Sequence, residues 1–252
     1  MIEVKELTKR YGERTAVDHI SFTVHRGEIL GFLGQNGAGK TTTMKMLTCF
    51  MSANSGSASI AGFDVFENPI EVKKRIGYLP EDTSGLGFLT GREYLHLIAA
   101  CHGIPKDRED AQSENLLDLL EMKDRQHALL RTYSAGMVKR ILIAGALLPD
   151  PNVLLLDEPA ANMDPDASNL IRRILRGLAD RGRTIFMSTH LLSSSEKTAD
   201  RVIILSGGRI LLDAKLVDLQ REHEHEDLEA MYLKYMKSTT SDRTDRFFEK
   251  ME

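Results

Sequence analysis

The chain has 252 residues, of which 42% are hydrophobic and 28% charged, and this suits one large α/β domain or such a domain with a small appendage. Its formal net charge of −4 leaves no basic excess, so we expect no nucleic-acid partner. The longest apolar run, residues 141–148, is far shorter than the roughly 20 residues that a helix needs to cross a bilayer. If the protein acts at a membrane, we expect another chain to provide the spanning part.

Strand and helix patterns alternate at the two ends of the chain. Strand-like segments are predicted at residues 1–7, 18–29, 28–34, 52–65, 153–159, 184–190 and 201–214. Helices are predicted within residues 35–47 and 165–182, and the periodicity is helical from about residue 90 to residue 145. The pattern predicts an α/β fold with a mainly parallel sheet, an N-terminal antiparallel β subdomain and an inserted helical subdomain.

The last part of the chain differs in character. We expect one domain over residues 1–219 and a C-terminal helix with a polar tail over residues 220–252. His223, Glu224 and His225 have no supporting cysteines, and we interpret them as a solvated helix face rather than a metal site. The two cysteines, Cys49 and Cys101, fit no metal-ligand spacing; we expect them to be unpaired in a reducing, cytoplasmic setting and to pack in the core.

A phosphate loop is predicted near the N-terminus. Residues 34–41, GQNGAGKT, match the pattern G-x-x-x-x-G-K-[ST] between a predicted strand and a predicted helix. Glycines let the backbone curl so that several N–H groups point at phosphate oxygens, and the helix N-terminus adds a favourable dipole. We expect Lys40 to hold the β- and γ-phosphates and the Thr41 hydroxyl to ligate Mg²⁺. The predicted nucleotide-binding residues here are Gly34, Gln35, Asn36, Gly37, Ala38, Gly39, Lys40, Thr41 and Thr42.

Two adjacent carboxylates end a later strand. Residues 153–156 are apolar and predict a buried strand whose C-terminal edge presents Asp157 and Glu158. Such a pair is costly without a cation or a proton, which suits Asp157 to the Mg²⁺ shell and Glu158 to polarising the attacking water. His190 ends the strand that follows, and ligands gather at the carboxyl ends of parallel strands, so we expect a functional role for it. Together these motifs predict a nucleoside triphosphatase.

The order of the motifs resembles the nucleotide-binding subunit of an ATP-binding-cassette (ABC) transporter over about residues 1–218. That family carries a signature, commonly Leu-Ser-Gly-Gly-Gln, before the second carboxylate strand, and residues 133–137, YSAGM, match it. Ser134 is a good helix N-cap, Gly136 permits close backbone approach, and the helix that follows presents free N–H groups to an anion. The resemblance implies a head-to-tail dimer with two shared ATP molecules; we expect a homodimer, with a heterodimer as the open alternative. The signature residues that would close over the other subunit's ATP are Ser134, Ala135, Gly136 and Met137, with added positive potential from Lys139 and Arg140.

Further roles follow from the resemblance position by position. Tyr11 matches the aromatic residue that stacks on adenine, Asp164 the D-loop aspartate that contacts the opposite subunit, and His190 the switch histidine at the γ-phosphate. Glu81 stands where the family has a glutamine that reaches Mg²⁺; a carboxylate can still ligate the ion, but it adds negative charge beside Glu158.

Several positions depart from the family pattern. Ala135 and Met137 replace the usual signature glycine and glutamine, and Asn162 and Met163 replace the usual small residue and leucine of the D-loop. Glutamate in the lid and methionine in the signature resemble one subgroup, exporters whose permease is a separate six-helix chain.

The resemblance implies an ATPase that needs ATP and Mg²⁺, lies on the cytoplasmic face of a membrane and drives export through a separate permease. Lys40, Glu158 and His190 are the expected catalytic residues, and Thr41, Glu81 and Asp157 the expected metal ligands. One alternative is a soluble ABC ATPase acting as a mechanical or regulatory module; the single cassette without heptads or a basic tail argues against it. A monomeric P-loop kinase would leave the signature, Asp164 and the helical block without a purpose.

Overall fold

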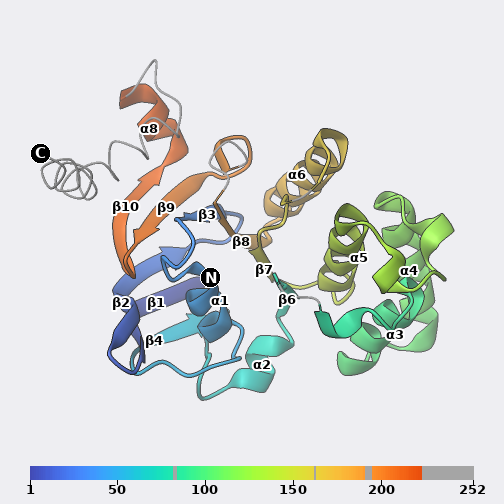
Figure 1. The fold of residues 1–252 in the computed structure, drawn as a ribbon, viewed down its shortest axis with the longest axis horizontal. Coiled ribbons are helices and arrows are strands. Elements are labelled where there is room, and N and C mark those ends of the chain that lie inside the picture. The colour runs from blue at the N-terminus through green and yellow to red at the C-terminus, as the bar shows by residue number, and fades with distance from the viewer. Residues whose placement is uncertain (82–83, 162, 191–194, 223–252) are drawn as a thin grey trace, which may run out of the picture.

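The computed structural model describes residues 1–81, 84–161, 163–190 and 195–222 (Figure 1). Two β-sheets form its centre, one of four strands and one of six. The smaller sheet is antiparallel, in the order β2-β1-β4-β5. Its strands are β1 (Ile2–Tyr11), β2 (Arg14–Val24), β4 (Ser55–Ile60) and β5 (Phe63–Asp64). This is the predicted N-terminal β subdomain, although β2 begins four residues before the predicted segment.

The larger sheet has the strand order β10-β9-β3-β8-β7-β6 and is parallel except for the edge strand β10. Its strands are β3 (Ile29–Leu33), β6 (Ile76–Leu79), β7 (Val153–Asp157), β8 (Thr184–Thr189), β9 (Arg201–Ser206) and β10 (Arg209–Lys215). Every residue of β3, β7 and β8 is buried, as expected for central strands covered on both faces. The predicted segment 201–214 is a hairpin, because Gly207 and Gly208 adopt φ values of 56° and 82° and turn the chain.

Helices cover the two faces of the larger sheet. Outside the helical block, the described ranges include the helices α1 (Lys40–Leu47), α2 (Pro69–Lys73), α6 (Pro165–Asp180) and α8 (Leu216–Glu222). On the side of α1 the core is continuous with the small sheet, and Phe22, Phe32 and Phe186 pack there with ring centroids 5.1 to 5.9 Å apart. On the other side α6 packs its apolar stripe, including Ile171 and Leu175, against the sheet. The predicted α/β fold class is therefore confirmed.

The inserted helical subdomain lies at one end of the molecule's long axis, opposite β10 and α8 (Figure 1). It contains α3 (Gly91–Cys101), α4 (Lys106–Leu119) and α5 (Ala135–Leu147), with 3₁₀ turns at Ser84–Leu86, Lys123–Arg125 and Leu130–Thr132. A capping box fixes the start of α3, in which Thr90 accepts a hydrogen bond from the Glu93 backbone and the Glu93 carboxylate accepts one from the Thr90 backbone. Cys101, at the end of α3, is exposed, so the expectation of core packing is wrong for this residue.

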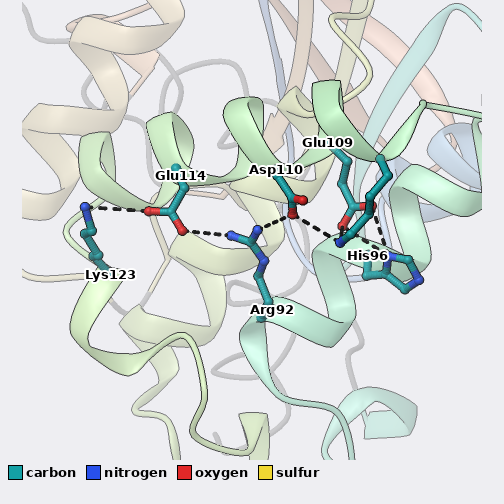
Figure 2. Close-up of polar contacts among 7 residues, drawn as sticks. Arg92, His96, Glu109, Asp110, Glu114 and Lys123 are labelled. Atoms are coloured by element: carbon teal, nitrogen blue, oxygen red, sulfur yellow. Dashed lines mark hydrogen bonds and ion pairs between the residues drawn. The ribbon is translucent and has the colours of Figure 1, made fainter.

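A network of ion pairs joins α3 to α4 (Figure 2). Arg92 contacts Asp110 at 2.6 Å and Glu114 at 3.1 Å, and His96 Nδ1 lies 3.0 Å from an oxygen of the buried Glu109 carboxylate. A carboxylate out of water needs partners of this kind, so the network fixes how the two helices pack.

The C-terminal part is described only as far as Glu222, where α8 ends. The predicted tail beyond it, including His223, Glu224 and His225, lies outside the described residues. None of the helices in the described ranges is both long enough and apolar enough to span a bilayer.

Candidate nucleotide-binding site

The predicted phosphate loop joins the end of β3 to the start of α1 at the carboxyl edge of the larger sheet. Sterics explain two of its glycines. A Cβ atom at Gly34 would lie 2.5 Å from the Leu205 carbonyl oxygen, and one at Gly39 would lie 2.4 Å from the Ala16 carbonyl oxygen. Gly39 also takes a left-handed conformation, with φ 113°, at the N-cap of α1. The sequence thus curls tightly here and leaves the backbone N–H groups of the loop and of the helix start unobstructed by side chains.

Lys40 sits inside this curl. Its ammonium group donates hydrogen bonds to the carbonyl oxygens of Gly34, at 2.7 Å, and Gln35, at 3.2 Å. Burial lowers the pKa of Lys40, and the carboxylates of Glu158, Asp157 and Glu81 act in the opposite direction. The ammonium group is therefore bound to the loop and lies near the carboxylates of Asp157, Glu158 and Glu81, where it can attract a phosphate group.

Asp157 ends β7, and one of its oxygens lacks a partner. Ser188, on the adjacent strand β8, donates a short hydrogen bond to Oδ1, whereas the buried Oδ2 has no hydrogen-bond partner among the described residues. Burial raises the pKa of Asp157, and the charges of Glu81 and Glu158 add to this effect. An unpaired buried carboxylate oxygen is a position for a cation.

Two more oxygen donors lie nearby. Thr41 Oγ1 is 3.5 Å from Glu81 Oε2, so the Thr41 hydroxyl, Glu81 and Asp157 offer the all-oxygen set that Mg²⁺ prefers. In the described ranges no group of three or more His, Cys, Asp and Glu residues forms a metal site on its own. Three protein oxygens fill only part of the six-coordinate shell of Mg²⁺, so the remaining positions suit phosphate and water.

Glu158 has both carboxylate oxygens held. The Thr189 hydroxyl donates to Oε2 at 2.9 Å, the His190 backbone N–H donates to Oε1 at 2.9 Å, and His190 Nδ1 lies 2.7 Å from Oε1. The backbone of Glu158 is left-handed, with φ 51°, which costs free energy for any residue with a Cβ. Strain of this kind at a fixed carboxylate is a common property of functional sites.

These residues line a pocket of about 440 Å³. Its walls come from Tyr11, Arg14, Ala16, Asn36, Gly37, Gly39, Lys40, Thr41, Thr42, Glu81, Asp157 and Glu158. Gly34, Gln35 and Ala38 belong to the turn behind it and do not line it. Arg14 and Ala16, at the start of β2, are missed by the sequence analysis. Arg14 Nη2 lies 3.5 Å from the Gly37 carbonyl oxygen, a contact that the sequence does not reveal because the two residues come from different elements.

Tyr11 lines the pocket and is partly exposed to solvent. Its side chain is 48% exposed, and Lys9 lies over the ring at 5.7 Å from the centroid. The hydroxyl group lies 3.3 Å from the sulfur of Met51. The Tyr11 ring is therefore held at its rim while one part of it stays accessible, as stacking on a base requires.

The signature residues lie apart from this pocket. Ser134 caps α5, its hydroxyl accepting a hydrogen bond from the Met137 backbone at 3.3 Å, as expected from the sequence. Ser134 and Ala135 are exposed, and none of the four signature residues lines the pocket. Asp164 likewise caps α6, through a 2.8 Å hydrogen bond from the Ala167 backbone. The neighbouring Asn162 lies outside the described residues.

The two basic residues of α5 point to partners within the same chain rather than to the exposed turn. Lys139 donates to the Asp157 carbonyl oxygen at 3.2 Å. Arg140 donates to the Leu120 carbonyl oxygen and to Glu121, and lies 3.8 Å from Asp164. The expectation that both simply add positive potential at the signature is therefore incomplete.

Comparison with known proteins identifies the family of the chain. The model of the family described as ABC transporter matches residues 17–161. The bacitracin transport ATP-binding protein BcrA of Bacillus licheniformis is 38% identical over 224 residues, which are 88% of this chain and 72% of that protein. The Nod factor export ATP-binding protein I of Ralstonia nicotianae is 34% identical over 215 residues, 85% of this chain and 67% of that protein. A solved structure of an ATP-binding subunit of an ABC transporter superposes with a TM-score of 0.86 at 29% identity, covering 94% of this chain and all of that one.

Proposed function

The chain belongs to the ABC transporter family as an ATP-binding subunit with ATPase activity, and from this premise we propose that two copies close around two ATP molecules and drive export through a separate membrane permease. The proposal places the protein on the cytoplasmic face of a membrane. The name of one relative, Nod factor export ATP-binding protein I, supports an outward direction of transport.

The proposed chemistry assigns roles to residues of the pocket and to His190, which lies beside Glu158 but does not line the pocket. The phosphate loop and Lys40 bind and orient the β- and γ-phosphates, and Tyr11 stacks on the adenine. Thr41, Glu81 and Asp157 would hold Mg²⁺, which when bound neutralises phosphate charge in the transition state. Glu158 polarises the attacking water, and His190 fixes the Glu158 carboxylate through Nδ1 and touches the γ-phosphate.

The dimer proposal depends on one observation: the signature turn does not line the nucleotide pocket of the same chain. Its capped helix start, at Ser134, presents backbone N–H groups on an exposed surface, where they are suited to an anion. A second copy placed head to tail would supply the missing wall to each site and give the exposed signature turn its ligand.

The test is Glu158→Gln, which removes the proposed base but keeps the shape of the side chain. We expect this variant to bind ATP and to elute from gel filtration as a dimer in ATP and as a monomer without nucleotide. Lys40→Ala in the same background is the control that should prevent the dimer, because it removes phosphate binding. A Glu158→Gln variant that binds ATP yet stays monomeric would contradict the shared-site proposal.

A second surface of the chain is suited to contact with a permease. A groove of about 580 Å³ runs between α2, β6 and the helical subdomain, and its lining is mainly apolar. Phe50 and Ile70 are 70% and 69% exposed there, and Lys73, whose ammonium lies 5.9 Å from the Phe50 ring centroid, adds positive charge. Exposed apolar area of this kind marks a protein contact. We propose that it receives a short helix of the permease with an apolar face and acidic flanks.

Affinity purification of the tagged chain from detergent-solubilised membranes tests this partner. We expect a permease to be recovered with the wild-type chain and lost with Ile70→Glu. Val217→Glu, which places the same charge at an exposed apolar residue of α8, is the matched control and should retain the permease. Recovery of the chain without a permease, or with nucleic acid or ribosomes, would favour a soluble ABC module instead.

A further inference from the structure

Lys139 joins the signature helix to the carboxylate strand of the same chain. It lies on α5, five residues after the capping Ser134, and its ammonium group donates to the Asp157 carbonyl oxygen at 3.2 Å. Asp157 is the residue whose Oδ2 is buried without a partner among the described residues. One side chain therefore connects the helix that begins at the signature turn with the residue best placed to bind a cation.

The charges around Lys139 make this contact sensitive to what the site holds. Asp157, Glu158 and Glu81 all attract its ammonium group, while burial lowers the pKa of Lys139. A divalent cation beside Asp157 and Glu81 would offset two of the negative charges that attract Lys139, and phosphate would add others. Binding in the pocket thus changes the force on a side chain that is fixed to α5.

The first turn of the same helix lies at the surface of the protein. Ser134 and Ala135 are exposed at the start of α5, and Gly136 and Met137 are half-buried behind them. Arg140, the next residue, fixes α5 to the Leu120 carbonyl oxygen in the helical subdomain and not to the pocket. Of the two basic residues of α5, Lys139 is therefore the one that the structure places beside the carboxylates of the pocket, whereas Arg140 pairs with Glu121 and Asp164.

We propose that Lys139 is a positioning residue that couples the two nucleotide sites, because it transmits the occupancy of the chain's own phosphate site to the signature turn that closes the other site. This rests on the shared-site dimer proposed above. Lys139 lies outside the residues that line the pocket, so its main effect is on closure of the dimer and not on the capture of ATP.

The experiment uses the full chain in the Glu158→Gln background and compares Lys139→Gln, Lys139→Arg and Lys123→Gln. Affinity for a fluorescent ATP analogue with Mg²⁺ is measured at low protein concentration, and ATP-driven dimerisation is measured by sedimentation. Lys123→Gln is the control, because this lysine lies in the helical subdomain with a side chain 58% exposed, paired with Glu114. Thermal unfolding of each variant checks that it folds.

For Lys139→Gln we expect ATP-analogue affinity within about threefold of the parent, while the protein concentration needed for half-dimerisation rises about tenfold, a usual size for coupling between sites. Lys139→Arg, which keeps the charge and the donors, should restore most of the dimerisation, and Lys123→Gln should match the parent. Unchanged dimerisation in Lys139→Gln, an equal loss in Lys139→Arg, or a tenfold loss of ATP-analogue affinity would each overturn the proposal. A parent that stays monomeric in ATP would instead refute the shared-site dimer itself.

Discussion

His190 holds Glu158 by two contacts, its backbone N–H donating to Oε1 at 2.9 Å and its Nδ1 atom lying 2.7 Å from the same oxygen. The Thr189 hydroxyl fixes the other oxygen, so the carboxylate cannot rotate freely. Since His190 and Glu158 directly follow the adjacent strands β8 and β7, the arrangement follows from the register of the sheet. A carboxylate held in one orientation loses little entropy when it engages a water molecule.

His190→Ala should therefore lower turnover without preventing ATP binding. The backbone contact stays, but the Nδ1 contact to Glu158 is lost, and we expect kcat to fall by roughly a hundredfold or more, the range for a group that acts with a general base. Steady-state ATP hydrolysis and binding of a fluorescent ATP analogue measure the two quantities. His127→Ala, at an exposed histidine of the helical subdomain, is the control. A His190→Ala variant with normal kcat would contradict the role.

Because the backbone of Glu158 is left-handed, we expect glycine at this position to give a more stable chain than alanine. Glycine usually destabilises a folded chain relative to alanine, but at φ 51° alanine carries the strain of its Cβ. We expect Glu158→Gly to exceed Glu158→Ala in free energy of unfolding by about 1 kcal/mol. Chemical denaturation without nucleotide measures this difference. If alanine proves the more stable of the two, the strained backbone is not present in solution.

Gly34 has no room for a side chain, although its backbone conformation is ordinary. Gly34→Ala puts a Cβ atom 2.5 Å from the Leu205 carbonyl oxygen, so the loop or β9 must shift. We expect a loss of about 1–3 kcal/mol in the free energy of unfolding, together with weaker ATP binding. Gly85→Ala is the matched control, because a Cβ atom there meets nothing within 4 Å. Equal stability of the two variants would show that the loop is less tightly packed than the structure has it.

The unpaired Oδ2 of Asp157 predicts how metal removal acts. With ATP present, Mg²⁺ should raise the melting temperature of the wild-type chain, because an ion that binds only the folded state stabilises it by mass action. EDTA should abolish this increment. In Asp157→Asn the carboxylate charge is gone, so ATP should still stabilise the chain but Mg²⁺ should add little. A full Mg²⁺ increment in Asp157→Asn would place the ion elsewhere.

The parts of the site that sequence predicted are those set by local rules. The glycines, Lys40 and Thr41 follow one another along the chain, and Asp157 and Glu158 follow a strand whose burial is visible in its apolar run. The contacts that Arg14 and Lys139 make in the structure were not predicted. Each contact depends on how elements far apart in the sequence pack against one another. The short strand β6, Ile76–Leu79, was not singled out, since four residues with one glycine carry too little pattern.

Ser134 has two functions that substitutions can separate. Its hydroxyl caps α5, and the same turn is proposed to meet the ATP of the other copy. Ser134→Ala removes the cap and should cost about 1 kcal/mol, or about 2–4 °C in melting temperature for a chain of this size. Ser134→Asp keeps a cap oxygen and places a negative charge favourably at the helix start, so it should match or exceed the wild type in stability.

For ATP-driven dimerisation we expect the opposite order, with Ser134→Ala retaining more of the dimer than Ser134→Asp. In the Glu158→Gln background an aspartate at the signature turn would face the phosphates of the opposite ATP, and like charges brought together out of water repel strongly. We therefore expect Ser134→Asp to abolish the ATP-driven dimer while single chains still bind ATP, and Ser134→Ala only to weaken the dimer. Sedimentation with ATP measures dimerisation, and thermal unfolding without ATP measures the stability of each variant. If the Ser134→Asp variant formed the dimer to the same extent as the parent that keeps Ser134, the turn would act only as a helix cap. The surface that closes the second site would then have to lie elsewhere on the chain.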